Sequence, residues 1–195
     1  MTVEQAATAI KEDGGCVIYP TETVYGLAAD ALNLESINRV FELKGRSRDN
    51  PISFAVPDIE TVDEYTRPTD RERAFMRAFL PGPITVVLER RSGAGVPDVL
   101  TGGRERVGVR IPDHPIALDL LERVAPLTAT SANRSGAGSA RRVEEIAPDF
   151  RDAVDAILDD GETPGSESTV VDVSTDTIHR RGALANEIEA WLTEE

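Results

Sequence analysis

Apolar residues along the chain follow two patterns, which predict alternating helices and strands. In residues 3–11, Val3, Ala6 and Ile10 recur at helical spacing, and glycines follow directly. Short continuous apolar runs between polar segments predict buried strands instead. The predicted helices cover residues 3–11, 35–43, 69–79, 115–124 and 186–192, and the predicted strands cover residues 16–19, 52–56, 84–88, 107–111, 127–130, 156–158 and 169–173.

Helix boundaries are signalled by a few residues. Thr69 followed by Glu72 makes a capping-box start, and the Pro-Gly-Pro at residues 81–83 ends the same helix. Lys44 and Gly45 fall at or just after the end of another predicted helix.

Frequent strands mixed with helices of about ten residues predict an α/β fold, with a sheet of mixed strand direction covered by helices. No internal repeat or break in composition divides the chain, so we expect one domain over residues 1–195. Long polar loops at strand ends are where an α/β fold places its site. The longest irregular stretches, rich in Gly, Ser, Arg and Asn, are residues 45–51, 92–104, 131–141 and 160–168.

Charge narrows the possible partners. The chain carries 35 Asp and Glu against 21 Lys and Arg, a net charge of -14, and its only lysines are Lys11 and Lys44. A strongly acidic, lysine-poor surface suits solubility at high salt, where ions screen self-repulsion, so we expect a halophilic source. Nonspecific nucleic-acid binding is disfavoured because it depends on cations that neutralise phosphates. Any anion site must therefore be a local pocket.

Other classes of protein and site are excluded by what the sequence lacks. No apolar stretch approaches the ~20 residues of a membrane span, and no basic leader precedes an apolar run, so we expect a cytoplasmic protein. One cysteine, Cys16, and two histidines, His114 and His179, exclude an internal disulfide and a cysteine- or histidine-rich metal site. Walker A, GxGxxG, HExxH and GxSxG motifs are absent.

Polar clusters remain at the ends of several predicted strands. Lys44 and Arg46 flank a glycine and can converge on one polyphosphate. Ser131 and Asn133 offer hydroxyl and amide groups to phosphate oxygens or a base edge, and Arg110 suits a carboxylate. Together these residues predict a pocket for a small anionic substrate beside a nucleotide.

Simpler interpretations of the same residues stay open at this point. Lys44 and Arg46 also suit a helix C-terminus, where positive charge complements the dipole. Ser131 and Asn133 suit a plain turn, and Arg110 suits a surface ion pair.

Seven ordered motifs resemble those of the YrdC-like family of threonylcarbamoyl-AMP synthases. The resemblance covers about residues 5–185. The chain is similar to the single-domain form of this family, which lacks the additional C-terminal domain of longer relatives. The motifs are YPTETVYGL at 19–27, KGRSRDNP at 44–51, LPGPITVVL at 80–88, VGVRIPDHPIALDLL at 107–121, TATSANRSG at 128–136, ESTVVDV at 167–173 and HRRG at 179–182.

The resemblance implies a twisted open sheet with a deep, positively lined cavity. It also implies an enzyme, a nucleotidyltransferase that joins ATP, L-threonine and bicarbonate or CO2 into L-threonylcarbamoyladenylate and pyrophosphate. Other proteins then transfer the threonylcarbamoyl group to adenosine 37 of tRNA. Mg2+ is expected to accompany ATP, with no tightly bound cofactor, no protein metal ligand and no stable binding of nucleic acid.

Site residues follow from the motif positions. The resemblance assigns Lys44 and Arg46 to catalysis. Glu22 is an acid inside a site motif, so we expect it to orient Lys44 or a water. Where relatives have a histidine that contacts threonine, this chain has Ala55. The expected ATP-binding residues are Lys44, Arg46, Asn50, Arg106, Ser131, Asn133, Ser139 and Arg180, and the expected threonine-binding residues are Thr23, Arg110, Thr130 and Ser168.

Two alternative functions stay open. One is a noncatalytic RNA-binding module of the same fold, because a basic cavity also suits RNA phosphates. The other is a related adenylate-forming enzyme for a different amino acid, which Ala55 keeps open.

Overall fold

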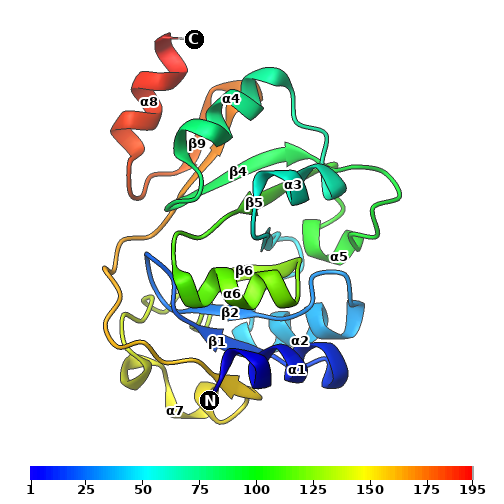
Figure 1. Cartoon of the computed structure of the whole chain (residues 1–195), viewed down its shortest axis with the longest axis vertical. Coiled ribbons are helices and arrows are strands. Elements are labelled where there is room, and N and C mark those ends of the chain that lie inside the picture. Colours follow the sequence, from blue (N-terminus) through cyan, green and yellow to red (C-terminus); the bar gives the residue numbers. More distant parts are fainter. Residues whose placement is uncertain (195) are drawn as a thin grey trace.

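The computed structural model describes residues 1–194, and in this part of the chain nine strands form one sheet (Figure 1). Its strand order is β7-β1-β2-β6-β3-β5-β4-β8-β9. The strands are β1 (Val17–Tyr19), β2 (Gly26–Ala28), β3 (Ser53–Ala55), β4 (Ile84–Glu89), β5 (Arg106–Arg110), β6 (Leu127–Ser131), β7 (Ala156–Ile157), β8 (Thr169–Asp172) and β9 (Thr177–Arg180).

The sheet mixes both strand directions, as the sequence predicts. The pairs β1/β7, β3/β5 and β4/β8 are parallel, whereas β1/β2, β2/β6, β3/β6, β4/β5 and β8/β9 are antiparallel. Segments that are distant in the sequence therefore lie side by side, and the strand-end motifs are brought toward one region of the sheet.

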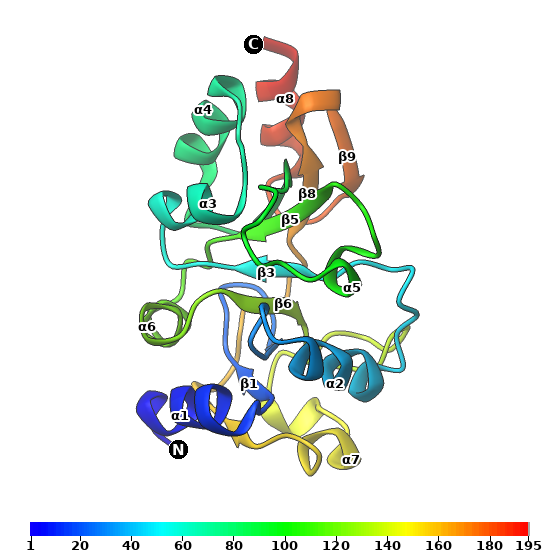
Figure 2. The same cartoon turned by 90° about the vertical axis from the view of Figure 1, so that its right-hand side faces the viewer.

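Helices cover the sheet on both sides (Figure 2). Ala6 and Ile10 of α1 pack with Ala117 and Leu120 of α6 over the first strands, in one apolar cluster. A larger cluster holds the buried faces of α2, α4 and α8. The helices are α1 (Val3–Asp13), α2 (Leu34–Lys44), α3 (Ile59–Tyr65), α4 (Asp70–Phe79), α5 (Asp98–Thr101), α6 (Pro115–Arg123), α7 (Pro148–Arg151) and α8 (Ala185–Glu194), with 3-10 turns η1 (Val143–Glu145) and η2 (Val173–Thr175).

The end of α2 positions one of the site loops. Its last residue is Lys44, and Gly45 follows with a φ of 57°, a left-handed conformation that glycine adopts at little cost. The chain then leaves the helix axis and enters the loop at residues 45–51. The predicted helix end at this lysine is confirmed.

Two strands and three short helices were not predicted. β2 has only three residues and no alternation to mark it, and β9 lies at the sheet edge with largely exposed side chains. The helices α3, α5 and α7 are seven residues or shorter, so each shows little periodicity.

Cys16 is fully buried as a small apolar residue, and burial raises the pKa of its thiol to about 11. Within residues 1–194, no helix combines the length and apolarity that crossing a membrane requires. The expectation of a single domain over residues 1–195 remains a prediction.

The capping box of α4 gives a test of local stability. Thr69 Oγ1 accepts from the Glu72 N–H at 3.2 Å, and Glu72 Oε2 accepts from the Thr69 N–H at 2.7 Å. We expect Thr69→Ala to lower the free energy of unfolding by about 1 kcal/mol, because it leaves a helix-end N–H unpaired. Denaturant unfolding at fixed salt measures the change. Thr8→Ala, on the exposed surface of α1, is the control and should change stability by less than about 0.5 kcal/mol.

Candidate functional site

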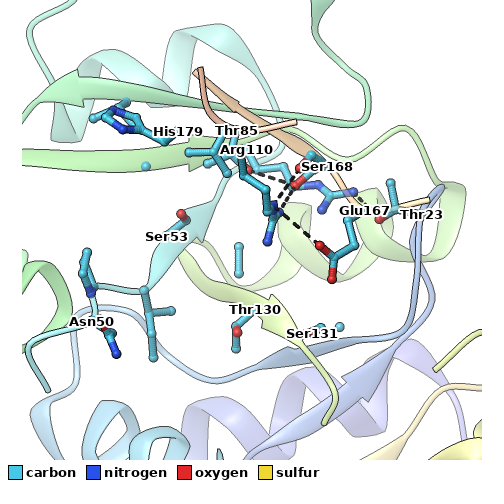
Figure 3. A pocket seen from close by; sticks show the side chains of 18 of the residues that line it. Thr23, Asn50, Ser53, Thr85, Arg110, Thr130, Ser131, Glu167, Ser168 and His179 are labelled. Atoms are coloured by element: carbon cyan, nitrogen blue, oxygen red, sulfur yellow. Dashed lines mark hydrogen bonds and ion pairs between the residues drawn. The ribbon is translucent and has the colours of Figure 1, made fainter. Parts of the chain in front are cut away.

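A cavity of about 560 Å3 is lined by residues from every strand of the described chain except β7 (Figure 3). On β4 and β5 the lining residues are two apart, namely Thr85 and Val87 on β4 and Arg106, Gly108 and Arg110 on β5. Side chains two apart on a strand point to the same face. The cavity therefore lies on one face of the sheet.

Gly108 keeps the floor of the cavity open. A Cβ at this position would lie 2.2 Å from Ser53 Oγ and 2.9 Å from Thr85 Cγ2. A larger residue here would displace the side chains of Ser53 and Thr85, which also line the cavity.

Positive charge dominates the lining. Arg46, Arg104, Arg106, Arg110 and Arg180 line the cavity, against the carboxylates of Glu167 and Asp172. This is a local reversal of sign in a chain whose net charge is -14. The arrangement can attract and hold anions.

Arg46 and Arg180 come from distant segments and converge on the same part of the cavity. Arg46 Nε and Nη2 donate to the carbonyl oxygens of Asn50 and Pro51 at 3.0 and 2.9 Å. Burial, followed by the positive charge of Arg180, lowers the pKa of Arg46. Two cations that repel each other in this way favour a multiply charged anion between them.

Lys44 lies beneath the cavity and does not line it. Its side chain is 2% exposed, and Nζ donates to the Ser131 carbonyl and, at 2.7 Å, to the Asn133 carbonyl. The Ser135 N–H donates back to the Lys44 carbonyl at 2.8 Å. Burial, followed by the charge of Arg46, lowers the pKa of Lys44 to about 8.

At the other end of the cavity, Arg110 is held by the turn that follows β1. Its Nη2 donates to Glu22 Oε1 and to Thr23 Oγ1, both at 2.8 Å. Glu22 therefore contacts Arg110 and not Lys44, whereas the alternative expectation, that it orients a water, stays a prediction. Glu22 pairs with Arg110 because the turn and the end of β5 lie together, a long-range proximity that spacing does not reveal.

Ser168 and Arg180 form a second hydroxyl-guanidinium contact. Arg180 donates from Nε to the Ser168 carbonyl at 3.0 Å and from Nη2 to Ser168 Oγ at 2.8 Å. Close by, Ser139 Oγ donates to Glu167 Oε1 at 3.0 Å. This last contact links the loop at residues 131–141 to the segment before β8.

Arg106 carries its own counter-charges. Its guanidinium lies 2.9 Å from a carboxylate oxygen of Glu72 and 2.9 Å from one of Asp172, both of which are buried. Two carboxylates compensate its charge, so Arg106 presents less positive charge to a ligand than Arg46 or Arg180 does.

Most of the residues predicted from the motifs meet around one cavity. Lys44 and Asn133 are the exceptions, because neither lines it. The Asn133 amide donates to the Arg134 and Ala137 carbonyls and shapes the loop. The predicted residues that line the cavity are Thr23, Arg46, Asn50, Arg106, Arg110, Thr130, Ser131, Ser139, Ser168 and Arg180.

Several lining residues escaped sequence reasoning. Tyr19 ends a buried strand, and its apolar neighbours indicated only core. Thr85 alternates with apolar residues on β4, a weak signal of a two-sided strand. Ser53, Glu167 and His179 stand next to or within recognised motifs, but no spacing marked them as lining residues.

Among residues 1–194, no three His, Cys, Asp or Glu side chains are grouped so that they could hold a metal ion. The carboxylate groups at the cavity are instead bound to arginine or serine.

Comparison with known proteins places the chain in a family. Residues 9–182 match the profile of the Sua5, YciO and YrdC proteins, described as "Telomere recombination". The chain belongs to the Sua5/YciO/YrdC family. The threonylcarbamoyl-AMP synthase of Bacillus subtilis is 39% identical over 196 residues, which cover 97% of this chain and 56% of that protein. The threonylcarbamoyl-AMP synthase of Pyrococcus abyssi is 42% identical over 172 residues, which cover 87% of this chain and 50% of that protein.

A solved structure of the Sua5/YciO/YrdC family agrees with the fold. The crystal structure of P. abyssi Sua5 complexed with L-threonine has a TM-score of 0.90 at 40% sequence identity. The match covers 97% of this chain and 56% of that one. The chain thus spans about half the length of the relatives compared here.

The buried lysine of this Sua5/YciO/YrdC protein predicts a dependence of stability on pH. Its folded pKa of about 8 lies below the ordinary value of 10.5, so between these values the unfolded chain binds more protons. The free energy of unfolding of wild type should therefore rise, relative to Lys44→Met, as pH increases from about 8 to about 10. Denaturant unfolding at several pH values tests this.

Lys11 provides the matched control for this experiment, because its side chain is exposed on α1. Lys11→Met should follow wild type across the same pH range. A constant difference in stability between wild type and Lys44→Met at every pH would contradict the prediction.

Proposed function

We propose that this chain is a threonylcarbamoyl-AMP synthase that acts on ATP, L-threonine and bicarbonate or CO2. The observation that carries the proposal is one cavity with two different anion sites, Arg46 with Arg180 in one part and Arg110 with Thr23 in another. The family membership and the names of the relatives support the same activity.

The chemistry needs two anions in contact. The neutral amine of threonine attacks CO2, loses a proton and becomes a carbamate. A carbamate oxygen then attacks the α-phosphorus of ATP, the bond from this phosphorus to the bridging oxygen breaks, and pyrophosphate leaves. Because the nucleophile belongs to the substrate, the protein supplies position and charge. This reaction class is nucleotidyl transfer.

The cavity offers groups for each part of this reaction. Arg46, Arg180 and Ser139 suit the phosphates, because they provide charged and neutral hydrogen-bond donors. The half-exposed Glu167 is the carboxylate near them, and it accepts from Ser139 Oγ at 3.0 Å and lies 3.9 Å from Arg180 Nε. Arg110, Thr23 and Ser168 suit the amino acid, because a guanidinium with adjacent hydroxyls matches a carboxylate.

Lys44 supports the phosphate site from below. Its ammonium is bound to the Ser131 and Asn133 carbonyls and so fixes the loop that carries Ser131 and Ser139. Its charge also adds to the positive potential at that end of the cavity. In this conformation Lys44 is a positioning residue, and its assignment to catalysis stays a prediction.

Wider roles follow from the same proposal. Mg2+ would enter with ATP as part of the substrate, held largely by phosphate oxygens and water, as is usual for this ion. The adenylate would be passed to proteins that modify adenosine 37 of tRNA. We place the protein in the cytoplasm on this basis, with no stable binding of nucleic acid.

Arg46→Ala tests the phosphate site. Removing a charged contact to phosphate should weaken ATP binding by about 1.5–3 kcal/mol and strongly reduce pyrophosphate release. The measurement is pyrophosphate release with ATP, L-threonine and bicarbonate, with mass identification of the adenylate. Arg48→Ala is the control, since Arg48 lies in the same loop but is exposed and donates to Asn38. Pyrophosphate release by Arg46→Ala equal to that of the control would contradict the assignment.

Arg110→Ala tests the amino-acid site. We expect a raised KM for threonine with little change in ATP affinity, because the variant loses a carboxylate contact but leaves Arg46 and Arg180 in place. The variant also leaves the Glu22 carboxylate without its partner, which lowers stability. The double variant with Glu22→Gln removes this cost and should keep the raised threonine KM. An unchanged KM in both variants would exclude the carboxylate role.

A further inference from the structure

Tyr19 ends β1 and places its ring across the sheet in the cavity wall. Its side chain is 2% exposed, yet it lines the cavity. The ring lies over Gly26, where an added Cβ would come within 2.8 Å of Tyr19 Cε1. The Tyr19 hydroxyl itself lies 3.3 Å from this Cβ position, so glycine leaves room for both the ring and the hydroxyl over β2.

The hydroxyl of Tyr19 is unpartnered. No hydrogen bond joins it to another group of residues 1–194, whereas the Tyr25 hydroxyl donates to the Gly161 carbonyl at 2.8 Å. Buried tyrosine hydroxyls usually find a partner. Tyr19 lines the cavity, so a hydroxyl without a protein partner there is free to bond a ligand.

The protonation state of Tyr19 makes it a donor. Burial raises the pKa of its phenol to about 12, and nearby Arg110 offsets this only in part. The group therefore keeps its proton at neutral pH and can donate to an acceptor atom of a ligand.

Tyr19 and Arg110 belong to the same face of the sheet. Paired residues on neighbouring strands lie on the same face, and so do residues two apart on one strand. Tyr19 pairs with Gly26, which pairs with Ser131 on β6. Two residues before Ser131, Ala129 pairs with Ser53 on β3, and two residues after Ser53, Ala55 pairs with Arg110. The turn that follows Tyr19 is the one that binds the Arg110 guanidinium through Glu22 and Thr23. The small side chain of Ala55 packs in the same cluster as Tyr19.

A buried O–H donor and a guanidinium on one face together suit an anionic acceptor. We propose that the Tyr19 hydroxyl donates a hydrogen bond to the carboxylate of the amino-acid substrate, alongside Arg110. This inference rests on the proposed function and adds to it a residue that sets the affinity for the amino acid. Tyr19 is thus a binding residue and takes no part in proton transfer.

Tyr19→Phe removes one oxygen and keeps the ring. Titration of the purified protein with L-threonine should show affinity about tenfold weaker than wild type, the loss expected for one hydrogen bond to a charged group. ATP affinity and the melting temperature should stay close to wild type. Tyr65→Phe is the matched control, because Tyr65 packs edge-on against Phe54 and does not line the cavity. Its threonine affinity should equal that of wild type.

A second ligand decides which part of the amino acid is contacted. L-2-aminobutyrate keeps the carboxylate of threonine and lacks its hydroxyl. If Tyr19 binds the carboxylate, Tyr19→Phe weakens both ligands by the same factor. A loss confined to threonine would show that the phenol contacts the side-chain hydroxyl, which would overturn the proposal.

Gly26→Ala tests the same hydroxyl without altering it. The added Cβ displaces the Tyr19 ring and should weaken threonine binding as Tyr19→Phe does. Wild-type threonine affinity in Tyr19→Phe would overturn this inference and leave the proposed function standing. Failure of the wild-type protein to bind threonine at all would instead overturn the proposed function, and this inference with it.

Discussion

Mutual repulsion among the cavity arginines is the constraint on which the site depends. Five guanidiniums line one cavity, and hydrogen-bond acceptors from the same loop or from distant segments hold them in place. Backbone carbonyls hold Arg46, two buried carboxylates hold Arg106, and Glu22 with Thr23 holds Arg110. These acceptors are in place in the folded protein, so the remaining N–H groups need little rearrangement to bind an anion. The acidic surface does not provide such a site, and screening by salt limits its effect on charges inside the cavity.

Compensation of this charge is uneven along the cavity. Arg106 and Arg110 each lie within 2.9 Å of a carboxylate oxygen, whereas the Arg180 Nε lies 3.9 Å from Glu167 and Arg46 is held by neutral carbonyls. Excess positive charge therefore remains near Arg46 and Arg180, where it suits a polyphosphate. The nearly neutral pair at Arg110 suits a single carboxylate. This asymmetry favours one orientation of ATP and amino acid over the reverse, which supports the proposed reaction.

The pattern of elements predicted the mixed sheet, and the resemblance to the YrdC-like family predicted most of the residues that line the cavity. Some of these residues also stand at strand ends, which the fold brings together. Arg110, at the end of an alternating strand, is the clearest example. Side-chain contacts between distant segments could not be predicted from the sequence pattern. Nothing local shows that Glu72, a capping residue of α4, also binds Arg106, or that Glu22 binds Arg110. Tyr19 was missed for a related reason, since only the neighbouring strand shows that its ring lies over a glycine.

Lys44, one of only two lysines in the chain, ends α2 at a position that suits an ammonium group. Its Nζ reaches two backbone carbonyls from a buried position, and a third hydrogen bond joins its own carbonyl to the loop. An ammonium carries three donors on a flexible stem, which suits a small space between two carbonyls. A guanidinium would bring five donors in a rigid plane, and several would be buried without acceptors. The compact ammonium therefore fits the junction of α2 with the loop after β6. Because Lys44 binds the Ser131 carbonyl and lies two residues before Arg46, it holds Arg46 and Ser131 near each other.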